Sequence, residues 1–195
     1  MTHSQAKTVG ILAVQGDFEL HGKMLDRLGA TWKLLKHPEE LQDVCGLIMP
    51  GGESTTMLKF FAAEGWTTPL REFGAAGRPI FGTCAGTILL ANEVLNPAQE
   101  SLGLMEITVE RNAYGRQVDS SIRLGECPDL TNHPVEMVFI RAPIIRRVGD
   151  GLRVLGRCDG SPVLVEQGNL LAATFHPELT DECVIHRYFL QKCKP

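Results

Sequence analysis

The sequence lacks the features that mark proteins which bind nucleic acids or membranes. It contains no run of Lys and Arg, and its formal net charge is −4. A basic patch is the usual requirement for binding nucleic acid or an anionic membrane surface, so neither is expected as a partner. The early apolar run at 9–14 is short and is interrupted by Gly10, which is not the pattern of a secretory signal. No stretch approaches the roughly 20 apolar residues that a membrane-spanning helix needs.

The six cysteines form no CxxC pair and no regular framework. Without closely spaced pairs of ligands, the sequence predicts no metal site. Irregularly spaced thiols favour a reducing, cytoplasmic environment over a disulfide-bonded one. The chain also has no repeats or low-complexity segments, and its 195 residues, 44% of them hydrophobic, are enough to bury one core. We therefore expect residues 1–195 to form a single cytoplasmic domain.

The first half of the chain alternates between strand and helix patterns. Continuous apolar runs are typical of strands buried in a parallel sheet, and apolar residues three or four apart indicate helices. On these grounds we expect strands at 8–14, 32–35, 46–49 and 80–81, and helical segments at 18–28, 38–41, 54–61, 69–73 and 87–95. This alternation predicts a parallel sheet with right-handed crossover connections.

The character of the sequence changes after Pro97, where short strand patterns separated by turns predominate. Candidate strands lie at 104–109, 117–124, 135–140, 152–155, 163–166 and 170–175, with a hairpin turn at 167–169 and a closing helix at 181–193. Together with the first half, this pattern predicts an α/β fold of three layers around a mostly parallel sheet.

Cys84 occupies the most distinctive position in the sequence. It lies in Gly82-Thr-Cys-Ala-Gly86, between an apolar strand and an apolar helix. Glycines two positions either side of a nucleophile permit the tight elbow that presents it in a strained turn with its sulfur exposed. A helix that begins at the cysteine favours the thiolate, and the Ala85 N–H points to the place where an oxyanion would form. Since most cysteines are simply small buried residues, a base elsewhere is needed to support a catalytic role.

A histidine and a glutamate at the end of the last strand are the candidates for that role. His176 follows the apolar run 170–175, and Glu178 lies two residues further on. Parallel sheets carry their sites at the carboxyl ends of strands, so His176 is expected near Cys84. Glu178 can orient the imidazole, which completes a Cys–His–Glu triad. Alternatively, His176 is a structural histidine and Glu178 a solvated acid at a helix start.

The combination of a cysteine elbow with a later His-x-Glu resembles the class I, triad-type glutamine amidotransferases, whose fold is flavodoxin-like. Longer motifs are similar, more narrowly, to the glutaminase subunits of pyridoxal 5′-phosphate synthase. The resemblance spans nearly the whole chain. Its motifs are Pro50-Gly-Gly-Glu-Ser-Thr-Thr-Met57, Phe81-Gly-Thr-Cys-Ala-Gly86, Val109-Glu-Arg-Asn112, Gly115-Arg-Gln-Val-Asp-Ser120, Phe139-Ile-Arg-Ala-Pro143 and Phe175-His-Pro-Glu-Leu-Thr180.

The resemblance implies hydrolysis of L-glutamine to glutamate and ammonia, with no metal or organic cofactor. The ammonia would pass to a separate (β/α)₈ synthase subunit in a hetero-oligomer that makes pyridoxal 5′-phosphate. By position in the motifs, the glutamine-binding residues are Gly52, Glu53, Ser54, Arg111, Ile140 and Arg141.

Elementary chemistry agrees with part of this assignment. An arginine pairs well with the carboxylate of glutamine, and Glu53 is suited to its ammonium group. The turn at Gly51-Gly52 is suited to supply an oxyanion donor beside Ala85. Without the motif, a surface ion pair is the better interpretation of either arginine alone, and the glycines are also consistent with a simple turn.

Three other functions remain open at this point. The first is an amidotransferase subunit of another synthase. The second is a cysteine hydrolase that acts on a substrate other than glutamine, and the third is a binding protein that retains the elbow for packing. The stretches at 51–56 and 140–143 argue against the first by resemblance, and the intact triad argues against the last.

Overall fold

The computed structural model describes residues 8–111 and 120–193. Its centre is a seven-stranded sheet in the order β10-β11-β12-β4-β3-β1-β2. Neighbouring strands from β12 to β2 all run parallel, whereas β11 and β10 are antiparallel additions at one edge. The bounds are β1 (Thr8–Leu12), β2 (Thr31–Leu35), β3 (Gly46–Met49), β4 (Ile80–Thr83), β10 (Arg153–Cys158), β11 (Ser161–Gln167) and β12 (Leu170–Ala173).

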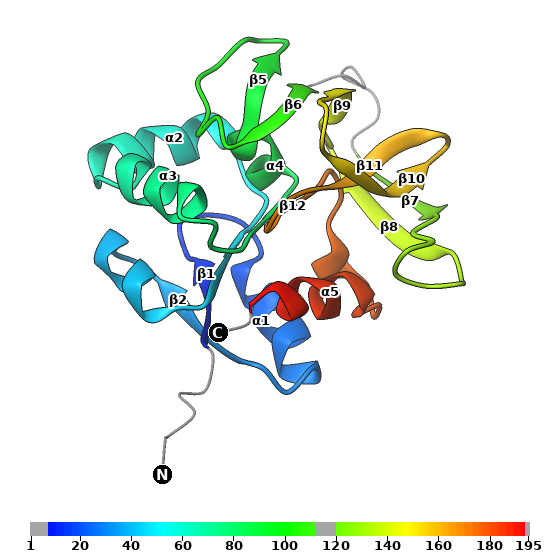
Figure 1. Ribbon diagram of the computed structural model, residues 1–195, viewed down its shortest axis with the longest axis horizontal. Coiled ribbons are helices and arrows are strands. Elements are labelled where there is room, and N and C mark those ends of the chain that lie inside the picture. Colours follow the sequence, from blue (N-terminus) through cyan, green and yellow to red (C-terminus); the bar gives the residue numbers. More distant parts are fainter. Residues whose placement is uncertain (1–7, 112–119, 194–195) are drawn as a thin grey trace.

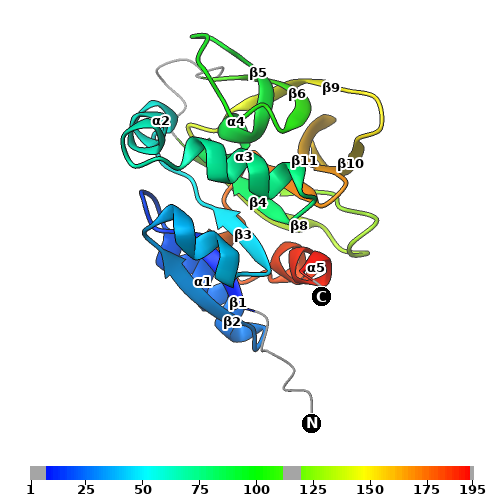
Figure 2. The same ribbon diagram turned by 60° about the vertical axis from the view of Figure 1, so that its left-hand side comes forward.

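Helices cover both faces of this sheet (Figures 1 and 2). On one face lie α1 (Phe18–Arg27) and α5 (Val184–Lys192), and on the other α2 (Ser54–Ala63), α3 (Thr67–Ala75) and α4 (Ala85–Leu90). Two 3₁₀ helices, η1 (Pro38–Asp43) and η2 (Pro177–Leu179), complete the helical segments of the described chain. Within 8–111 and 120–193, no helix is long and apolar enough to cross a membrane.

Side-chain alternation along the strands gives each face its own hydrophobic core. In β4, Ile80 packs with the α2–α4 side and Phe81 with the α1–α5 side. In β3, Met49 and Ile48 divide between the two faces in the same way. Successive side chains of a strand point to opposite faces, so continuous apolar strands fill both layers at once. This confirms the predicted α/β fold of three layers around a mostly parallel sheet.

Two small sheets extend the domain beyond the central one. A three-stranded sheet contains β5 (Ala91–Leu95), β6 (Met105–Glu110) and β9 (Ile144–Val148), and a hairpin pairs β7 (Ser120–Gly125) with β8 (Val135–Ile140). Strand β9 has no counterpart in the sequence prediction. The predicted strand at 117–124 is found from Ser120 onward, and its first three residues lie outside the described chain.

The predicted helix at 87–95 is wrong over its second half. The helix α4 ends at Leu90, and Ala91–Leu95 forms β5, which pairs in parallel with β6. Ala91 has extended angles, φ −59° and ψ 148°, and its side chain and that of Val94 are buried. Long-range pairing with β6 therefore overrides a local pattern that fits either structure.

The predicted hairpin turn and two other predicted helical segments are present at or near their expected positions. The hairpin turn at 167–169 joins β11 to β12, with Gln167 paired to Leu170 and Gly168 at φ 58°. The closing helix begins at Val184 rather than 181, because η2 and the following loop come first. The helical segment predicted at 38–41 is confirmed as the start of the 3₁₀ helix η1.

Candidate active site

Four neighbouring strands bring the predicted site together at one edge of the sheet. The strands β12, β4, β3 and β1 are consecutive in the sheet and parallel. Their carboxyl ends lead to His176, Cys84, Gly51 and Gln15. Parallel neighbours end at the same edge, so residues spread over 160 positions of sequence meet in one place. The sequence predicted this convergence of strand ends, and the topology confirms it.

Cys84 is held in the strained turn that the sequence predicted. Its φ is 48° and ψ −103°, a conformation that residues other than glycine rarely adopt. A Cβ on Gly82 would lie 2.7 Å from the backbone of Gly86, and one on Gly86 would lie 2.2 Å from the Met49 carbonyl oxygen. Side chains at these two positions would clash with backbone, so both glycines are needed for the elbow.

The sulfur is less exposed than the sequence predicted. Cys84 is 7% exposed overall, and it lines the pocket described below. Its Sγ lies 3.8 Å from the carbonyl oxygen of Ile140 on β8. The residue therefore opens to the pocket and not to the general surface.

His176 and Glu178 form a tight buried pair. Nδ1 of His176 lies 2.8 Å from Oε1 of Glu178, and the Glu178 side chain is fully buried. Burial opposes charge on His176, but hydrogen bonds to Cys84 and Glu178 outweigh it and raise the pKa of the imidazole to about 10. Burial likewise opposes charge on Glu178, yet interaction with His21 and His176 lowers the pKa of that carboxyl. The pair is therefore an imidazolium beside a carboxylate at neutral pH.

Gly51 shows how closely the histidine and the cysteine approach each other. A Cβ on this residue would lie 2.5 Å from Cε1 of His176 and 3.3 Å from Cβ of Cys84. The β3 loop therefore passes directly over both side chains. The side chains of His176 and Cys84, the predicted base and nucleophile, therefore lie close together beneath this loop.

A pocket opens beside the cysteine. Besides Cys84 itself, its lining contains every residue predicted to bind glutamine, together with Ile88, which the sequence did not single out: Gly52, Glu53, Ser54, Cys84, Ile88, Arg111, Ile140 and Arg141. A second hollow continues from it past His176 to Gln15 and Gly16. Residues that follow β1, β3, β4 and β6, together with residues of α2, α4 and β8, thus line these two adjoining hollows. Their roles toward a ligand stay predictions.

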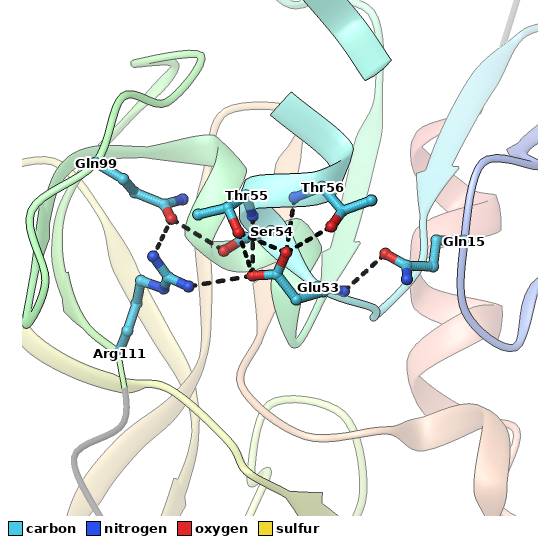
Figure 3. A network of polar contacts seen from close by, with 7 residues as sticks. All are labelled: Gln15, Glu53, Ser54, Thr55, Thr56, Gln99 and Arg111. Atoms are coloured by element: carbon cyan, nitrogen blue, oxygen red, sulfur yellow. Dashed lines mark hydrogen bonds and ion pairs between the residues drawn. The ribbon is translucent and has the colours of Figure 1, made fainter. Parts of the chain in front are cut away.

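Glu53 is the centre of a polar network at the pocket wall (Figure 3). Its carboxylate accepts hydrogen bonds from the Thr55 and Thr56 N–H groups, at 3.2 and 2.7 Å, and thereby caps the first turn of α2. Burial would raise the pKa of Glu53, but hydrogen bonds from both threonines lower it to about 2. The carboxylate predicted to meet the substrate ammonium is therefore already engaged with the helix.

Arg111 is fixed from two sides within this network. Its Nη2 lies 3.3 Å from Oε1 of Glu53, and its Nη1 donates a hydrogen bond to Oε1 of Gln99. Gln99 also accepts from the Ser54 hydroxyl at 3.1 Å. No local pattern marks Gln99, because it lies in an irregular segment and meets Ser54 only across 45 positions of sequence. Asn112, the last residue of the Arg111 motif, lies outside the described chain.

Two backbone features complete the pocket. Arg141 has φ 42°, so a second strained residue lines the same pocket as the cysteine. Gly52 has φ 148°, a value reserved for glycine, at the turn predicted to donate to an oxyanion. Ala85, the other predicted donor, is the first residue of α4.

The loop after β1 supports the glycine turn directly. The side-chain oxygen of Gln15 accepts a hydrogen bond from the Glu53 N–H at 2.9 Å (Figure 3). A Cβ on Gly16 would lie 2.0 Å from the Gly51 carbonyl oxygen, so the two loops are in backbone contact. Any change at Gln15 or Gly16 is therefore transmitted to the turn beside Cys84.

A cysteine elbow, a His–Glu pair and an arginine-lined pocket on a parallel sheet are the features expected of a triad-type amidotransferase, and the comparisons with known proteins show the family. The chain belongs to the SNO glutamine amidotransferase family, whose profile matches residues 11–195. It is 56% identical over 191 residues to the pyridoxal 5′-phosphate synthase subunit PdxT of Solibacter usitatus, which covers 95% of this chain and 99% of that one. It is 49% identical over 186 residues to the PdxT subunit of Thermotoga maritima, with 95% and 99% covered.

Solved structures agree with this assignment. A crystal structure of a glutamine amidotransferase superposes with a TM-score of 0.89 at 47% identity, covering 95% of this chain and 98% of the other. The structure of PurLQS from Thermotoga maritima gives a TM-score of 0.73 at 16% identity, covering 97% and 100%. At that identity, the second likeness concerns the fold alone.

Proposed function

We propose that this chain is the glutaminase subunit of a pyridoxal 5′-phosphate synthase, and that it hydrolyses L-glutamine to L-glutamate and ammonia. The observation that carries the proposal is the pocket in which Cys84 lies beside the two arginines, Arg111 and Arg141. A cysteine next to an imidazolium–carboxylate pair suits acyl transfer, and arginines suit a substrate that carries a free carboxylate.

Cys84 is the proposed nucleophile. Its thiolate attacks the side-chain amide carbon of glutamine, and the carbonyl oxygen becomes an oxyanion that accepts from the N–H groups of Gly52 and Ala85. The imidazolium of His176 gives its proton to the amide nitrogen as the carbon–nitrogen bond breaks, which releases ammonia and leaves a glutamyl thioester. Glu178 keeps the ring oriented and stabilises its charge.

Hydrolysis of the thioester then restores the site. His176, now neutral, takes a proton from a water molecule whose oxygen attacks the thioester carbon. The carbon–sulfur bond breaks, glutamate leaves, and Cys84 returns to the thiolate beside a protonated imidazole. All of these steps use side chains and backbone of this chain, so the proposal requires no metal or organic cofactor.

Binding of glutamine is assigned to the rest of the pocket. The guanidinium groups of Arg111 and Arg141 are suited to the α-carboxylate, and Glu53 provides the negative charge nearest the α-ammonium. Glu53 is also the cap of α2, so the carboxylate that it offers to the ammonium is already shared with the first N–H groups of the helix. Ser54 and the Ile140 backbone complete the contacts in this proposal.

We infer further that the chain works within a cytoplasmic hetero-oligomer with a (β/α)₈ synthase subunit. Its relatives are named as subunits of pyridoxal 5′-phosphate synthase, which supports a separate synthase subunit as the acceptor of the ammonia. The Gln15–Gly16 loop contacts the glycine turn, so a partner docked there is placed to order the oxyanion donors. One such donor is worth about 10²–10³ in kcat.

The experiment measures ammonia release from glutamine by the isolated chain and with saturating synthase subunit. We expect slow release alone and an increase of about 10²–10³ with the partner. No release from glutamine in the complex would overturn the proposed activity. A preference for peptide amides over free glutamine would favour the cysteine hydrolase instead. Equal rates with and without the partner would refute the coupling alone.

A further inference from the structure

The second oxygen of Glu178 faces a buried pair of histidines that the triad does not include. Nε2 of His21, on α1, lies 3.4 Å from Glu178 Oε2, and both side chains are fully buried. Nδ1 of His21 lies 2.9 Å from Nε2 of His186 on α5, which is also fully buried. The line of contacts therefore runs from His186 through His21 and Glu178 to His176.

The contact between His21 and Glu178 is long for a hydrogen bond. At 3.4 Å it lies beyond the usual range, and among the described residues Oε2 makes no hydrogen bond of ordinary length. His21 is nevertheless the polar side chain that faces this oxygen, and its Nε2 also lies 3.3 Å from the Thr83 hydroxyl. Catalytic hydrogen bonds in ligand-free sites are often long and tighten when substrate binds.

The charge states of Glu178 and the two histidines determine which ring nitrogen of each histidine carries a proton. Burial lowers the pKa of His21 and lowers that of His186 well below its ordinary value, so both rings are neutral. A neutral ring has one donor and one acceptor. Because Glu178 is a carboxylate, the His21 proton belongs on Nε2, which leaves Nδ1 to accept from the His186 Nε2–H.

Other charges around His21 fit this arrangement. Glu178 and Asp17 favour a proton on the ring, whereas the charge of His176 and burial oppose it. His186 contributes a neutral donor from α5, and Thr83 contributes a hydroxyl from β4. The only full charges that bear on the ring are thus the His176–Glu178 pair and Asp17, among the residues described.

We propose that His21 is a positioning residue of the triad, which holds Glu178 through its second oxygen, and that His186 fixes the tautomer of His21. The inference rests on the proposed glutaminase function. With Oε1 bound to His176 and Oε2 held by His21, the carboxylate cannot rotate away from the imidazole. The device also ties the site to α1 and α5, the helices that carry His21 and His186.

Two variants of His21 separate positioning from packing. His21→Leu removes the donor and fills the same space with an apolar side chain. His21→Gln instead places an amide N–H near the position of Nε2. We expect His21→Leu to lower kcat about 10- to 100-fold with little change in KM, and His21→Gln to recover most of the loss. We also expect the acid limb of the pH–rate profile to move to higher pH in His21→Leu, because the buried carboxylate loses a donor that favours its charge.

A double-mutant cycle tests whether His21 acts through Glu178. In a Glu178→Gln background, His21→Leu should cause less than a twofold further loss, since the group it positions is already altered. Leu25→Ala, which removes packing from the same helix, is the control for lost stability and should leave the acid limb in place. Losses that simply multiply, or a His21→Leu variant with wild-type kcat and pH profile, would overturn the proposal.

A readout without catalysis keeps the inference distinct from the proposed function. The carboxyl carbon of Glu178, labelled with ¹³C, reports its pKa by NMR in the folded chain. We expect that pKa to rise in His21→Leu and to return toward the wild-type value in His21→Gln. An unchanged pKa in His21→Leu would contradict the inference even if the complex proved inactive on glutamine.

Discussion

The carboxylate of Glu53 holds the guanidinium of Arg111, with Oε1 3.3 Å from Nη2, while it also caps the first turn of α2. The arginine side chain is 12% exposed, so the ion pair is partly shielded from water at the pocket wall. Helix α2 and strand β6 are therefore joined by one charged group. The start of the helix and the position of Arg111, the arginine proposed to bind substrate, depend on the same residue.

The first prediction follows from this double role. Glu53→Ala should raise the KM for glutamine and lower the free energy of unfolding by about 1 kcal/mol, the usual value of a lost helix cap. Thr56→Val is the matched control, because it removes one hydrogen bond of the same cap without contacting Arg111. It should lower stability and leave KM unchanged, as measured by denaturant unfolding and glutaminase kinetics. A Glu53→Ala variant with wild-type KM would show that Glu53 has no part in substrate binding.

The second prediction concerns the two arginines. Arg111→Ala or Arg141→Ala should raise KM about 10- to 100-fold, since a hydrogen bond to a charged group is worth about 1.5–3 kcal/mol. Neither residue contacts the reacting amide in the proposal, so kcat should change less. Arg146→Ala removes an arginine whose partner is Glu110, outside the pocket lining, and should leave KM unchanged. A defect confined to kcat would contradict the assigned role.

The third prediction compares two His–Glu pairs. His176→Ala should be nearly as damaging as loss of the nucleophile, and Glu178→Gln should cost less because the third member orients the base. His133 forms a similar 2.9 Å contact with Glu182, but its side chain is 62% exposed. His133→Ala should therefore retain full activity. Wild-type rates for His176→Ala at saturating glutamine would exclude it as the base.

The fourth prediction is a pH dependence of stability. The pKa of His176 is raised in the folded chain to about 10, above the ordinary 6.5. Its protonation therefore stabilises the fold fully below about pH 6.5, and the contribution is lost as pH rises toward 10. The difference in free energy of unfolding between wild type and His176→Ala should shrink over that interval. A constant difference from pH 6 to 10 would show that the raised pKa is absent.

The convergence of the site could be predicted from the sequence because each part has a local signal. Glycines 82 and 86 mark the elbow, and an apolar run leads into His176. Parallel strands then fix where the ends must meet, and the observed order β12-β4-β3-β1 follows that rule.

The remainder depends on contacts between distant segments, which leave no local pattern. Ala91–Leu95 has apolar residues that fit a helix as well as a strand, and pairing with β6 decides between them. His21 has no local signal beyond its helical spacing to Phe18 and Leu25, and its partner His186 is 165 positions away. Gln99 likewise acquires its role only when the chain folds it against Arg111.

The most direct test of the account uses glutamine labelled with ¹⁵N in its side-chain amide, in the presence of saturating synthase subunit. We predict that the wild-type chain releases labelled ammonia and that Cys84→Ala lowers kcat by a factor on the order of 10⁶ while the fold is retained. Circular dichroism and binding to the synthase subunit control for folding of the variant. Labelled ammonia released by Cys84→Ala at a tenth of the wild-type rate or more would show that Cys84 is not the nucleophile.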